Sequence, residues 1–492
     1  MTLRKIFTVG TFAVLSLALA HCDGSGTSGN NVDQGSTQDM AMPPPVITSV
    51  APGAVSNGGG VSITITGTGF QTGATVTVAG VACANPVVTA TTITCTTGAT
   101  TSPVCGPTTI VVTNPDQKTT SNNTALQLKS KSLGFGNPSN IANVANDPNS
   151  KSAATADLNG DGNMDVVNLD EVAGGAGVVP KLSIHLGKGD GTFLATTVVN
   201  LPATSNPTSL AVGDITGDNK LDVVIAYGGT DQVQVFSGDG QGGFTGQTAV
   251  NVAAKNPISI ALGDINADGK LDAVIGHLAG NGLTTLTNTS GVLGGGTSIN
   301  LGGMTITQIS SVAVADVNAD SKPDVVVTGA TSNNIAVFLG QGAAKFGAPT
   351  VFTMPGGPAR LVLTDFNNDK KLDVATANAG AGTVSIRLGD ALGGFGGTTP
   401  FTSIAAGMNS IALSAGDFDL DGNIDLVVAN STGSNFTALT GKGDGTLNAG
   451  KTFGTNAGPS SIVSADYNRD GSLDVVTTSS TPNLAINLNV CQ

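Results

Sequence analysis

The residues best able to do chemistry are aspartates that recur in a nine-residue pattern. The first copy reads DLNGDGNMD, and each copy places oxygen-bearing side chains at positions 1, 3, 5 and 9 with no Cys or His among them. Hard oxygen ligands of this kind select calcium, or less well magnesium, over zinc. Without a cation the carboxylates of one copy would repel one another. The seven copies occupy residues 157–165, 214–222, 264–272, 316–324, 365–373, 417–425 and 466–474.

The predicted ligand set takes positions 1, 3, 5, 7 and 9 of every copy. An alternative interpretation, a series of Asp/Asn/Gly turns that needs no metal, is weaker for seven copies that each carry at least three carboxylates. We therefore expect up to seven structural Ca²⁺ ions. The predicted ligands are Asp157, Asn159, Asp161, Asn163, Asp165, Asp214, Thr216, Asp218, Lys220, Asp222, Asp264, Asn266, Asp268, Lys270, Asp272, Asp316, Asn318, Asp320, Lys322, Asp324, Asp365, Asn367, Asp369, Lys371, Asp373, Asp417, Asp419, Asp421, Asn423, Asp425, Asp466, Asn468, Asp470, Ser472 and Asp474.

The copies differ at position 6, where the turn often needs a positive φ and therefore favours glycine. Glycine stands there in the first, third, sixth and seventh copies, Asn219 in the second, and Ser321 and Lys370 in the fourth and fifth. Thr216 at position 3 further weakens the second copy. We predict that the first, third, sixth and seventh loops bind the metal best, and the fourth and fifth worst.

The copies begin 49 to 57 residues apart, and such a fixed period is typical of a propeller or a solenoid. Each repeat is predicted to contain an apolar strand before the loop, a second strand after it, a third alternating strand, a Gly-rich turn and a final strand. The chain ends at Asn483–Asn489, which has the pattern of a third strand. We expect the extended run at 133–144 to supply the missing fourth strand and to close the ring.

With its flanking strands, the nine-residue pattern resembles the FG-GAP/VCBS repeats of integrin alpha-chain heads and of many secreted bacterial proteins. The resemblance covers about residues 130–492. It implies a seven-bladed β-propeller with calcium in the loop between the first two strands of each blade.

The preceding segment, residues 46–129, contains short alternating runs separated by Gly, Pro and Asn, which indicate a β-sandwich. Its ITSVAPGAVSNGGGVSITITGTGF and IVVTNPD stretches resemble the IPT/TIG immunoglobulin-like domain. The predicted fold class is therefore all-β, an immunoglobulin-like β-sandwich followed by a seven-bladed β-propeller. The predicted strands of the sandwich are Val46–Val50, Val61–Thr66, Ala74–Ala79, Val87–Cys95, Thr108–Thr113 and Thr124–Leu128.

The N-terminus is predicted to direct export. Residues 1–22 combine a basic start with an apolar run from Ile6 to Ala20, which is short for a membrane span and typical of a secretory signal. Leu19-Ala20-His21-Cys22 resembles a bacterial lipobox with Cys22 acylated, although His21 departs from the usual small residue. Ordinary cleavage after Ala20 is the alternative. Residues 23–45 then have the composition of a flexible tether.

Cysteine parity favours the lipoprotein. Lipidating Cys22 leaves four cysteines, enough for two disulfides in an oxidising compartment. Of the three possible connectivities, we expect Cys83–Cys95 within the first domain, and as a weaker hypothesis Cys105–Cys491.

Composition excludes several function classes. The chain has a formal charge of −14, and 22 of its 34 acidic residues lie in the seven loops. No basic stripe suggests nucleic-acid binding. GTLNAGKT at 445–452 matches a phosphate-loop pattern, but no helix-forming sequence follows it. His185 and His277 have no Cys/His ligand set around them, so we expect no catalytic role.

The sequence predicts a non-catalytic protein, lipid-anchored on an outer or periplasm-facing surface or else secreted. We expect it to be a monomeric adhesion or interaction protein that binds a protein or polysaccharide partner at the cell surface. The absence of Trp and the presence of only 2 Tyr argue against an aromatic sugar platform and slightly favour a protein partner. Two alternatives stay open: a calcium-dependent enzyme acting on polysaccharides, and a purely structural envelope or matrix component.

Overall fold

The protein is described by a computed structural model, and its described residues are all β. They are 43–100, 106–129, 133–141, 150–170, 179–279, 282–299, 306–390, 392–396, 402–481 and 483–490. Every regular element in these ranges is a strand. They include no helix with the length and apolar character needed to cross a membrane. The predicted signal, most of the tether, Cys22, Cys105 and Cys491 lie outside the described residues.

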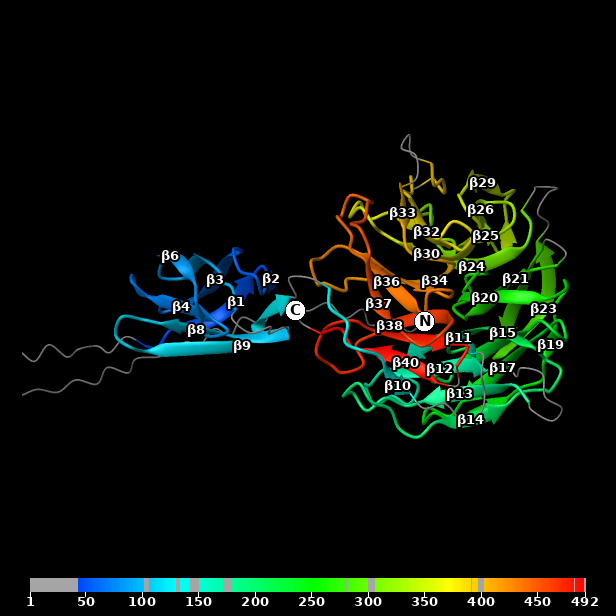
Figure 1. Ribbon diagram of the computed structural model, residues 1–492, viewed down its shortest axis with the longest axis horizontal. Coiled ribbons are helices and arrows are strands. Elements are labelled where there is room, and N and C mark those ends of the chain that lie inside the picture. Colours follow the sequence, from blue (N-terminus) through cyan, green and yellow to red (C-terminus); the bar gives the residue numbers. More distant parts are fainter. Residues whose placement is uncertain are drawn as a thin grey trace, which may run out of the picture. The chain divides into compact units, whose positions relative to one another are not determined.

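The N-terminal domain packs two sheets around one apolar core, as the predicted sandwich requires (Figure 1). One sheet has the order β1 (Val46–Ala51), β3 (Ser62–Thr68), β7 (Thr92–Thr96), β6 (Ala84–Val88). The other has the order β2 (Ala54–Ser56), β9 (Thr119–Lys129), β8 (Gly106–Thr113), β4 (Thr75–Val78), β5 (Val81–Ala82).

The predicted strand at 87–95 is wrong as a single element. It is a hairpin of β6 and β7, because the Thr89 hydroxyl accepts the Thr92 N–H at 2.9 Å and turns the chain. Cys83 and Cys95, both buried, are joined by a disulfide with a Cα–Cα distance of 5.7 Å.

The second domain is a ring of seven sheets, the blades of a propeller, which follow one another around the ring in chain order (Figure 1). The first blade comprises β11 (Ser150–Ala156), β12 (Asp165–Asp170), β13 (Lys181–His185) and β14 (Thr197–Asn200). The second comprises β15 (Pro207–Gly213), β16 (Asp222–Tyr227), β17 (Gln232–Gly238) and β18 (Phe244–Gly246), with β19 (Val250–Asn251) also on β17. The third comprises β20 (Pro257–Gly263), β21 (Asp272–His277), β22 (Leu283–Thr289) and β23 (Val292–Ile299).

The fourth blade comprises β24 (Ile309–Ala315), β25 (Asp324–Gly329), β26 (Asn334–Phe338) and β29 (Thr350–Thr353), with a small hairpin of β27 (Gly340–Gly342) and β28 (Lys345–Phe346). The fifth comprises β30 (Pro358–Thr364), β31 (Asp373–Asn378), β32 (Thr383–Arg387) and β33 (Thr402–Ala405). The sixth comprises β34 (Ser410–Gly416), β35 (Asp425–Asn430), β36 (Asn435–Leu439) and β37 (Lys451–Gly454). The last comprises β38 (Pro459–Ala465), β39 (Asp474–Ser479), β40 (Leu484–Asn487) and β10 (Ser139–Ile141).

The predicted ring closure is confirmed. β10 pairs antiparallel with β40, so a strand from the start of the propeller completes its last blade. The pairing extends outward, since the Val490 N–H donates to the Gly134 carbonyl at 2.6 Å and Phe135 bridges Asn489. We call residues 133–141 the closing segment. Residues 142–144, also predicted to belong to it, lie outside the described range.

The first strands of the seven blades form the inner wall of the ring, and we call them the inner strands: β11, β15, β20, β24, β30, β34 and β38. Each packs against the inner strand of the next blade, and β38 packs against β11. Successive blades bury apolar side chains between them, because each strand alternates its side chains between the two faces.

Candidate metal centres in the blade loops

Each aspartate-rich loop joins the inner strand of a blade to its second strand. Position 1 follows the inner strand, and position 9 is the first residue of the second strand. The seven position-9 aspartates are fully buried, at 0% exposure: Asp165, Asp222, Asp272, Asp324, Asp373, Asp425 and Asp474. A carboxylate so placed needs hydrogen-bond donors or a cation.

Main-chain donors satisfy part of this need in the same way in every blade. In the first loop, Asp165 Oδ2 accepts the Leu158 N–H at 2.8 Å, and Oδ1 accepts the Gly187 N–H at 2.7 Å. Position 9 thus ties the start of its loop to the end of the third strand. The other six aspartates make the same pair of bonds.

Positions 1, 3 and 5 close the loop on itself. Asp157 accepts three main-chain N–H groups, those of Gly160, Asp161 and Gly162, at 2.8 to 3.1 Å. Asn159 Oδ1 accepts the Asp161 N–H at 3.1 Å, and Asp161 in turn accepts the Asn163 N–H at 2.7 Å. The latter bond lowers the pKa of Asp161. The loop therefore turns its oxygens inward, the arrangement that a cation-binding loop needs.

The left-handed backbone expected at position 6 is present in all seven loops, with φ between +65° and +90°. Position 4 is left-handed as well, from Leu420 at +57° to Gly217 at +77°, which was not predicted. Non-glycine residues pay about 1–2 kcal/mol in this region. The first loop has glycine at both places. The fourth and fifth have it at neither, since they carry Ala319, Ser321, Asn368 and Lys370.

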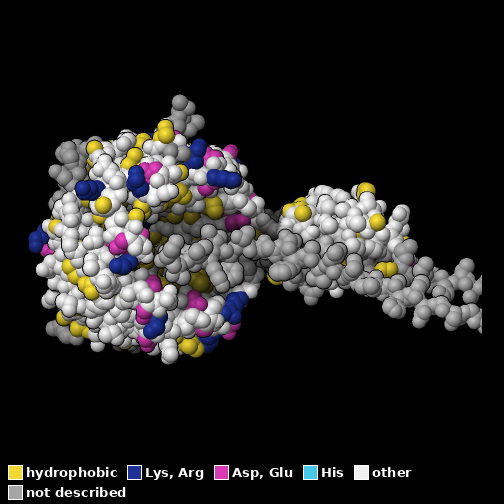
Figure 2. Space-filling model, turned by 180° about the vertical axis from the view of Figure 1, so that it is seen from behind, with side chains coloured by type: hydrophobic (Ala, Val, Ile, Leu, Met, Phe, Trp, Pro, Cys, Tyr) yellow, Lys and Arg dark blue, Asp and Glu magenta, His cyan; other side chains and the backbone are white. Residues whose placement is uncertain are grey.

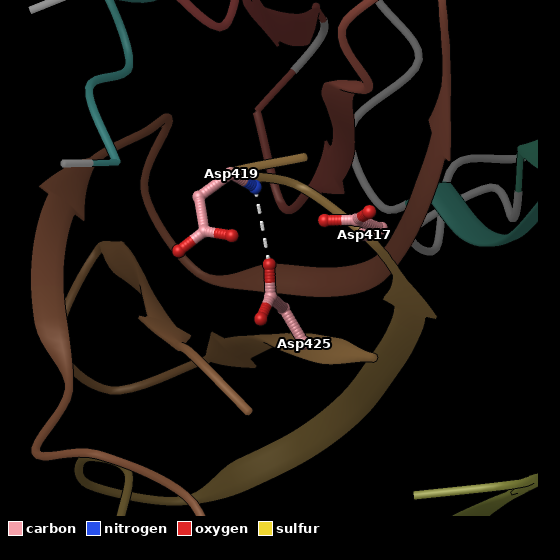
Figure 3. A group of neighbouring side chains, drawn as sticks. All are labelled: Asp417, Asp419 and Asp425. Atoms are coloured by element: carbon pink, nitrogen blue, oxygen red, sulfur yellow. Dashed lines mark hydrogen bonds between the residues drawn. The ribbon is translucent and has the colours of Figure 1, made fainter. Parts of the chain in front are cut away.

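The sixth loop brings three carboxylates together. Oxygens of Asp417, Asp419 and Asp425 all lie within 4.8 Å of one another (Figure 3). The Asp419 N–H also donates to Asp425 Oδ2 at 3.1 Å. Burial, and after it the Asp419 carboxylate, raises the pKa of Asp425 to about 8. Two carboxylates beside a third, buried one are the electrostatic setting that a divalent cation relieves. The predicted ligand Asp421 is outside this cluster.

Elsewhere among the described residues, no other group of three His, Cys, Asp or Glu comes so close. The other six loops have Asn or Thr at position 3, so positions 1, 3 and 9 cannot supply three carboxylates there. Burial still raises the pKa of the position-9 residue, to about 6 for Asp165 and about 7 for Asp474. It also raises the pKa values of Asp272, Asp324 and Asp373.

Position 7 needs a correction. Lysine stands there in the second to fifth loops, and an ammonium group cannot be a ligand of a cation. Lys220, Lys322 and Lys371 instead pair with the position-5 aspartate of their own loop, at 3.6, 3.3 and 3.1 Å. Only the main-chain carbonyl of position 7 could face a metal in those loops.

On the face seen in Figure 2, basic side chains stand beside aspartates rather than in a continuous stripe.

Two features of the site were not predicted. The first is the close packing of the glycine that opens the Gly-rich turn after the third strand: a Cβ added to Gly187 would lie 2.2 Å from the Met164 carbonyl oxygen. The signal was visible, since glycine recurs at this place in five repeats and is Asn288 or Asn489 in the others. The two asparagine amides donate to Ile215 and Phe418 of the preceding blade, each at 2.7 Å.

The second is the carbonyl at position 2 of the loops, which accepts a hydrogen bond from the next blade. Besides the two asparagine amides, main-chain N–H groups of Ala344, Gly445 and Gly191 donate to such carbonyls at 3.0 to 3.1 Å. The last of these bonds joins the first blade to the Tyr467 carbonyl of the last. The loops therefore connect blades as well as strands.

The two histidines of the propeller are buried side chains with hydrogen-bond partners. His185 contacts Asn168 at 2.9 Å and Thr196 at 3.0 Å, and His277 contacts Thr284 at 2.9 Å. Burial lowers the pKa of each to about 4, so both are neutral at pH 7. The phosphate-loop pattern at 445–452 ends in β37 rather than a helix, which removes the anion-binding geometry that pattern needs.

Comparison with known proteins identifies both parts of the chain. The sequence matches the FG-GAP-like repeat over residues 169–225, 214–275, 316–376, 365–428 and 417–477, and the IPT/TIG domain over residues 45–128. A search of curated proteins finds no match.

Three solved structures have related folds at low similarity. An auxiliary nutrient binding protein from Bacteroides ovatus is 11% identical, with a TM-score of 0.44, over 91% of this chain and 98% of its own. A protein from Bacteroides thetaiotaomicron provisionally described as a phosphatase is 10% identical, with a TM-score of 0.39, over 92% and 98%. The V. cholerae biofilm matrix protein Bap1 is 14% identical, with a TM-score of 0.39, over 73% and 91%. These similarities are too low to carry an argument about function. The repeat matches span more than half of the chain, which therefore belongs to the family of FG-GAP-like repeat proteins and carries an IPT/TIG domain before its propeller.

Proposed function

We propose that this chain is an exported, non-catalytic interaction protein of the cell surface whose propeller is stabilised by calcium. The observation that carries the metal part is the sixth loop, where the carboxylates of Asp417 and Asp419 lie close to that of the buried Asp425. Such an arrangement is costly without a cation and is made of the hard oxygen ligands that calcium prefers.

The side chains that would hold the ion are those at positions 1, 3, 5 and 9, joined by the main-chain carbonyl of position 7. The ion would supply positive charge that neutralises the buried carboxylates. Position 9 already ties the loop to the third strand, so a filled loop would fix three strands of a blade at one point. Loops that are strained at positions 4 and 6, or that carry lysine at position 7, are proposed to bind more weakly.

The interaction role rests on the scaffold and on the chemistry of the described residues. Both buried histidines are neutral and have hydrogen-bond partners, and the carboxylates cluster in the loops, so no general acid–base pair is indicated. We propose a protein or polysaccharide partner, no nucleic acid, a monomeric chain, and attachment through acylated Cys22 or free secretion. The calcium-dependent enzyme and the structural matrix component are the competing outcomes.

The first experiment is calcium binding and thermal melting of the chain without residues 1–22. We expect several bound ions by calorimetry and a large loss of melting temperature after chelation. Asp425→Asn should remove one binding event. Asp444→Asn, which changes the same charge in an exposed turn outside the loops, should keep all of them. No binding by the parent chain would reduce the seven loops to metal-free turns.

The partner is tested by capture on intact cells and extracellular matrix in millimolar calcium and after chelation. Recovery of a specific protein or polysaccharide only in calcium supports the interaction role. Uniform incorporation into the matrix with no specific partner favours the structural component, and turnover of a captured polysaccharide favours the enzyme.

A further inference from the structure

One charged side chain stands out in the wall of the ring. The seven inner strands contain only two charged residues, Lys151 and Arg360, and both are cations. Arg360 lies on β30, where strand register matches it to Ser152, Ser209, Ser259, Ser311, Ala412 and Ser461 of the other blades. Those six small residues are all at most 9% exposed, so an arginine at this place is a departure from the repeat.

Core packing shows which way Arg360 faces. Leu361 and Leu363 pack into the core shared with the fourth blade, whereas Val362 packs into the core shared with the sixth. Because side chains alternate along a strand, Arg360 shares the face of Val362 and points toward the sixth blade. At the matching place on the fourth blade, the Ser311 hydroxyl accepts the Leu361 N–H of the next inner strand at 3.4 Å. Arg360 therefore puts a guanidinium on the face where the other blades have a hydroxyl or a methyl group.

The Arg360 guanidinium has no hydrogen bond or ion pair to any part of the chain that the structure describes. The other described arginines do have such bonds: Arg387 donates to the Thr353 and Phe395 carbonyls, and Arg469 donates to the Asp161 carbonyl. Arg360 is only partly exposed, and burial lowers its pKa. The nearest aspartate along its strand, Asp365, is five residues away, or roughly 16 Å at about 3.3 Å per residue.

We propose that Arg360 forms an anion-binding site in the inner wall of the propeller that takes one carboxylate group of a ligand. A guanidinium presents a planar fork of donors that matches a carboxylate with two parallel hydrogen bonds. A singly charged group fits better than a multivalent phosphate, because one guanidinium neutralises one charge in a chain of formal charge −14. This site rests on the interaction role proposed above and specifies the partner further, as one that carries an acidic group.

The test uses acetate and its neutral isostere acetamide as probes, at constant ionic strength and with calcium present. Binding is read from the excess transverse relaxation of the ¹³C-labelled methyl group in the presence of the chain. We expect saturable excess relaxation for acetate and none for acetamide. Arg360→Gln should reduce the acetate effect at least fivefold, whereas Lys345→Gln, the same charge change at an exposed residue of β28, should leave it unchanged.

Arg360→Lys is the second variant, since it keeps the charge and removes the fork. We expect the acetate relaxation with this variant to lie between the values for the parent chain and for Arg360→Gln. The melting temperature of the variant reports whether the ring is intact. The proposal is overturned if the excess relaxation of acetate is as large with Arg360→Gln as with the parent chain. It is also overturned if acetate and acetamide show the same excess relaxation with the parent chain. Either failure would leave the calcium stoichiometry and the partner capture unaffected, so the two proposals fall separately.

Discussion

The closing segment should contribute a large share of the stability of the ring, and Phe135→Ala tests this. Phe135 is 6% exposed and makes edge-on contacts with Phe418, Phe436 and Phe453, at centroid distances of 6.1, 5.1 and 5.0 Å. Truncating a buried phenylalanine costs about 3–5 kcal/mol, which already includes most of the aromatic contacts. At about 2 °C per kcal/mol for a large domain, we expect the melting temperature to fall by roughly 6–10 °C.

The assay is thermal and urea unfolding with calcium held constant. Leu392→Ala is the control, because Leu392 is 80% exposed and its truncation should cost less than about 1 kcal/mol. Deleting residues 481–492 should lower the melting temperature more than Phe135→Ala does, because the deletion removes β40, the strand to which β10 pairs. A Phe135→Ala chain that melts within the error of Leu392→Ala would show that the closing segment lies outside the cooperative core, and the inferred closure of the ring would fail.

Three further predictions concern the loops and the disulfide. The pKa of the Asp425 carboxyl is about 8 in the folded chain and about 3.9 in an unfolded one. The folded state therefore binds the carboxyl proton more tightly, and the free energy of unfolding falls as pH rises between those two values. The chelated chain should therefore melt higher at pH 5 than at pH 8, and an unchanged pH trend in Asp425→Asn would refute the assignment. Lys371→Asn removes an exposed ion pair to Asp369 that competes with a bound cation. We therefore expect the calcium affinity of the fifth loop to rise by up to about fivefold, measured as metal occupancy by anomalous scattering at limiting calcium. In the parent chain, a stronger metal signal in the fifth loop than in the seventh would contradict the predicted order. Replacing Cys83 and Cys95 by serine should lower the free energy of unfolding of the first domain by about 3 kcal/mol, because the disulfide closes a loop with a sequence separation of 12. An unchanged urea midpoint of the double variant would contradict this prediction.

The fold was largely predictable because the repeat is strong. Seven copies of one pattern, each followed by an apolar strand, determine the number of blades, and the extended run predicted at 133–144 does supply a strand, β10, that pairs with β40. The hairpin at 84–96 was missed because a threonine turn interrupts an otherwise apolar run, and periodicity alone does not detect a hydroxyl cap.

The site was predictable only in part, because spacing in the sequence fixes residue types and leaves the paths of the loops undetermined. The loop positions and the left-handed residue at position 6 followed from the pattern. The left-handed residue at position 4 did not, since Leu420 and Arg469 have side chains that ordinarily avoid that region. Nor could the sequence reveal that position-5 Asp421 stays outside the cluster that Asp417, Asp419 and Asp425 form.

The carbonyl at position 2 gives the loops a mechanical role. At five junctions it accepts a hydrogen bond from the next blade, and one of these joins the last blade to the first. A loop that loses its cation would therefore loosen a joint between blades before it unfolds a sheet. Calcium depletion should make the ring open at its seams under load while each four-stranded blade persists. On the calcium binding and the interaction role proposed above, the calcium concentration around the protein would then set the force that its connection to a partner withstands.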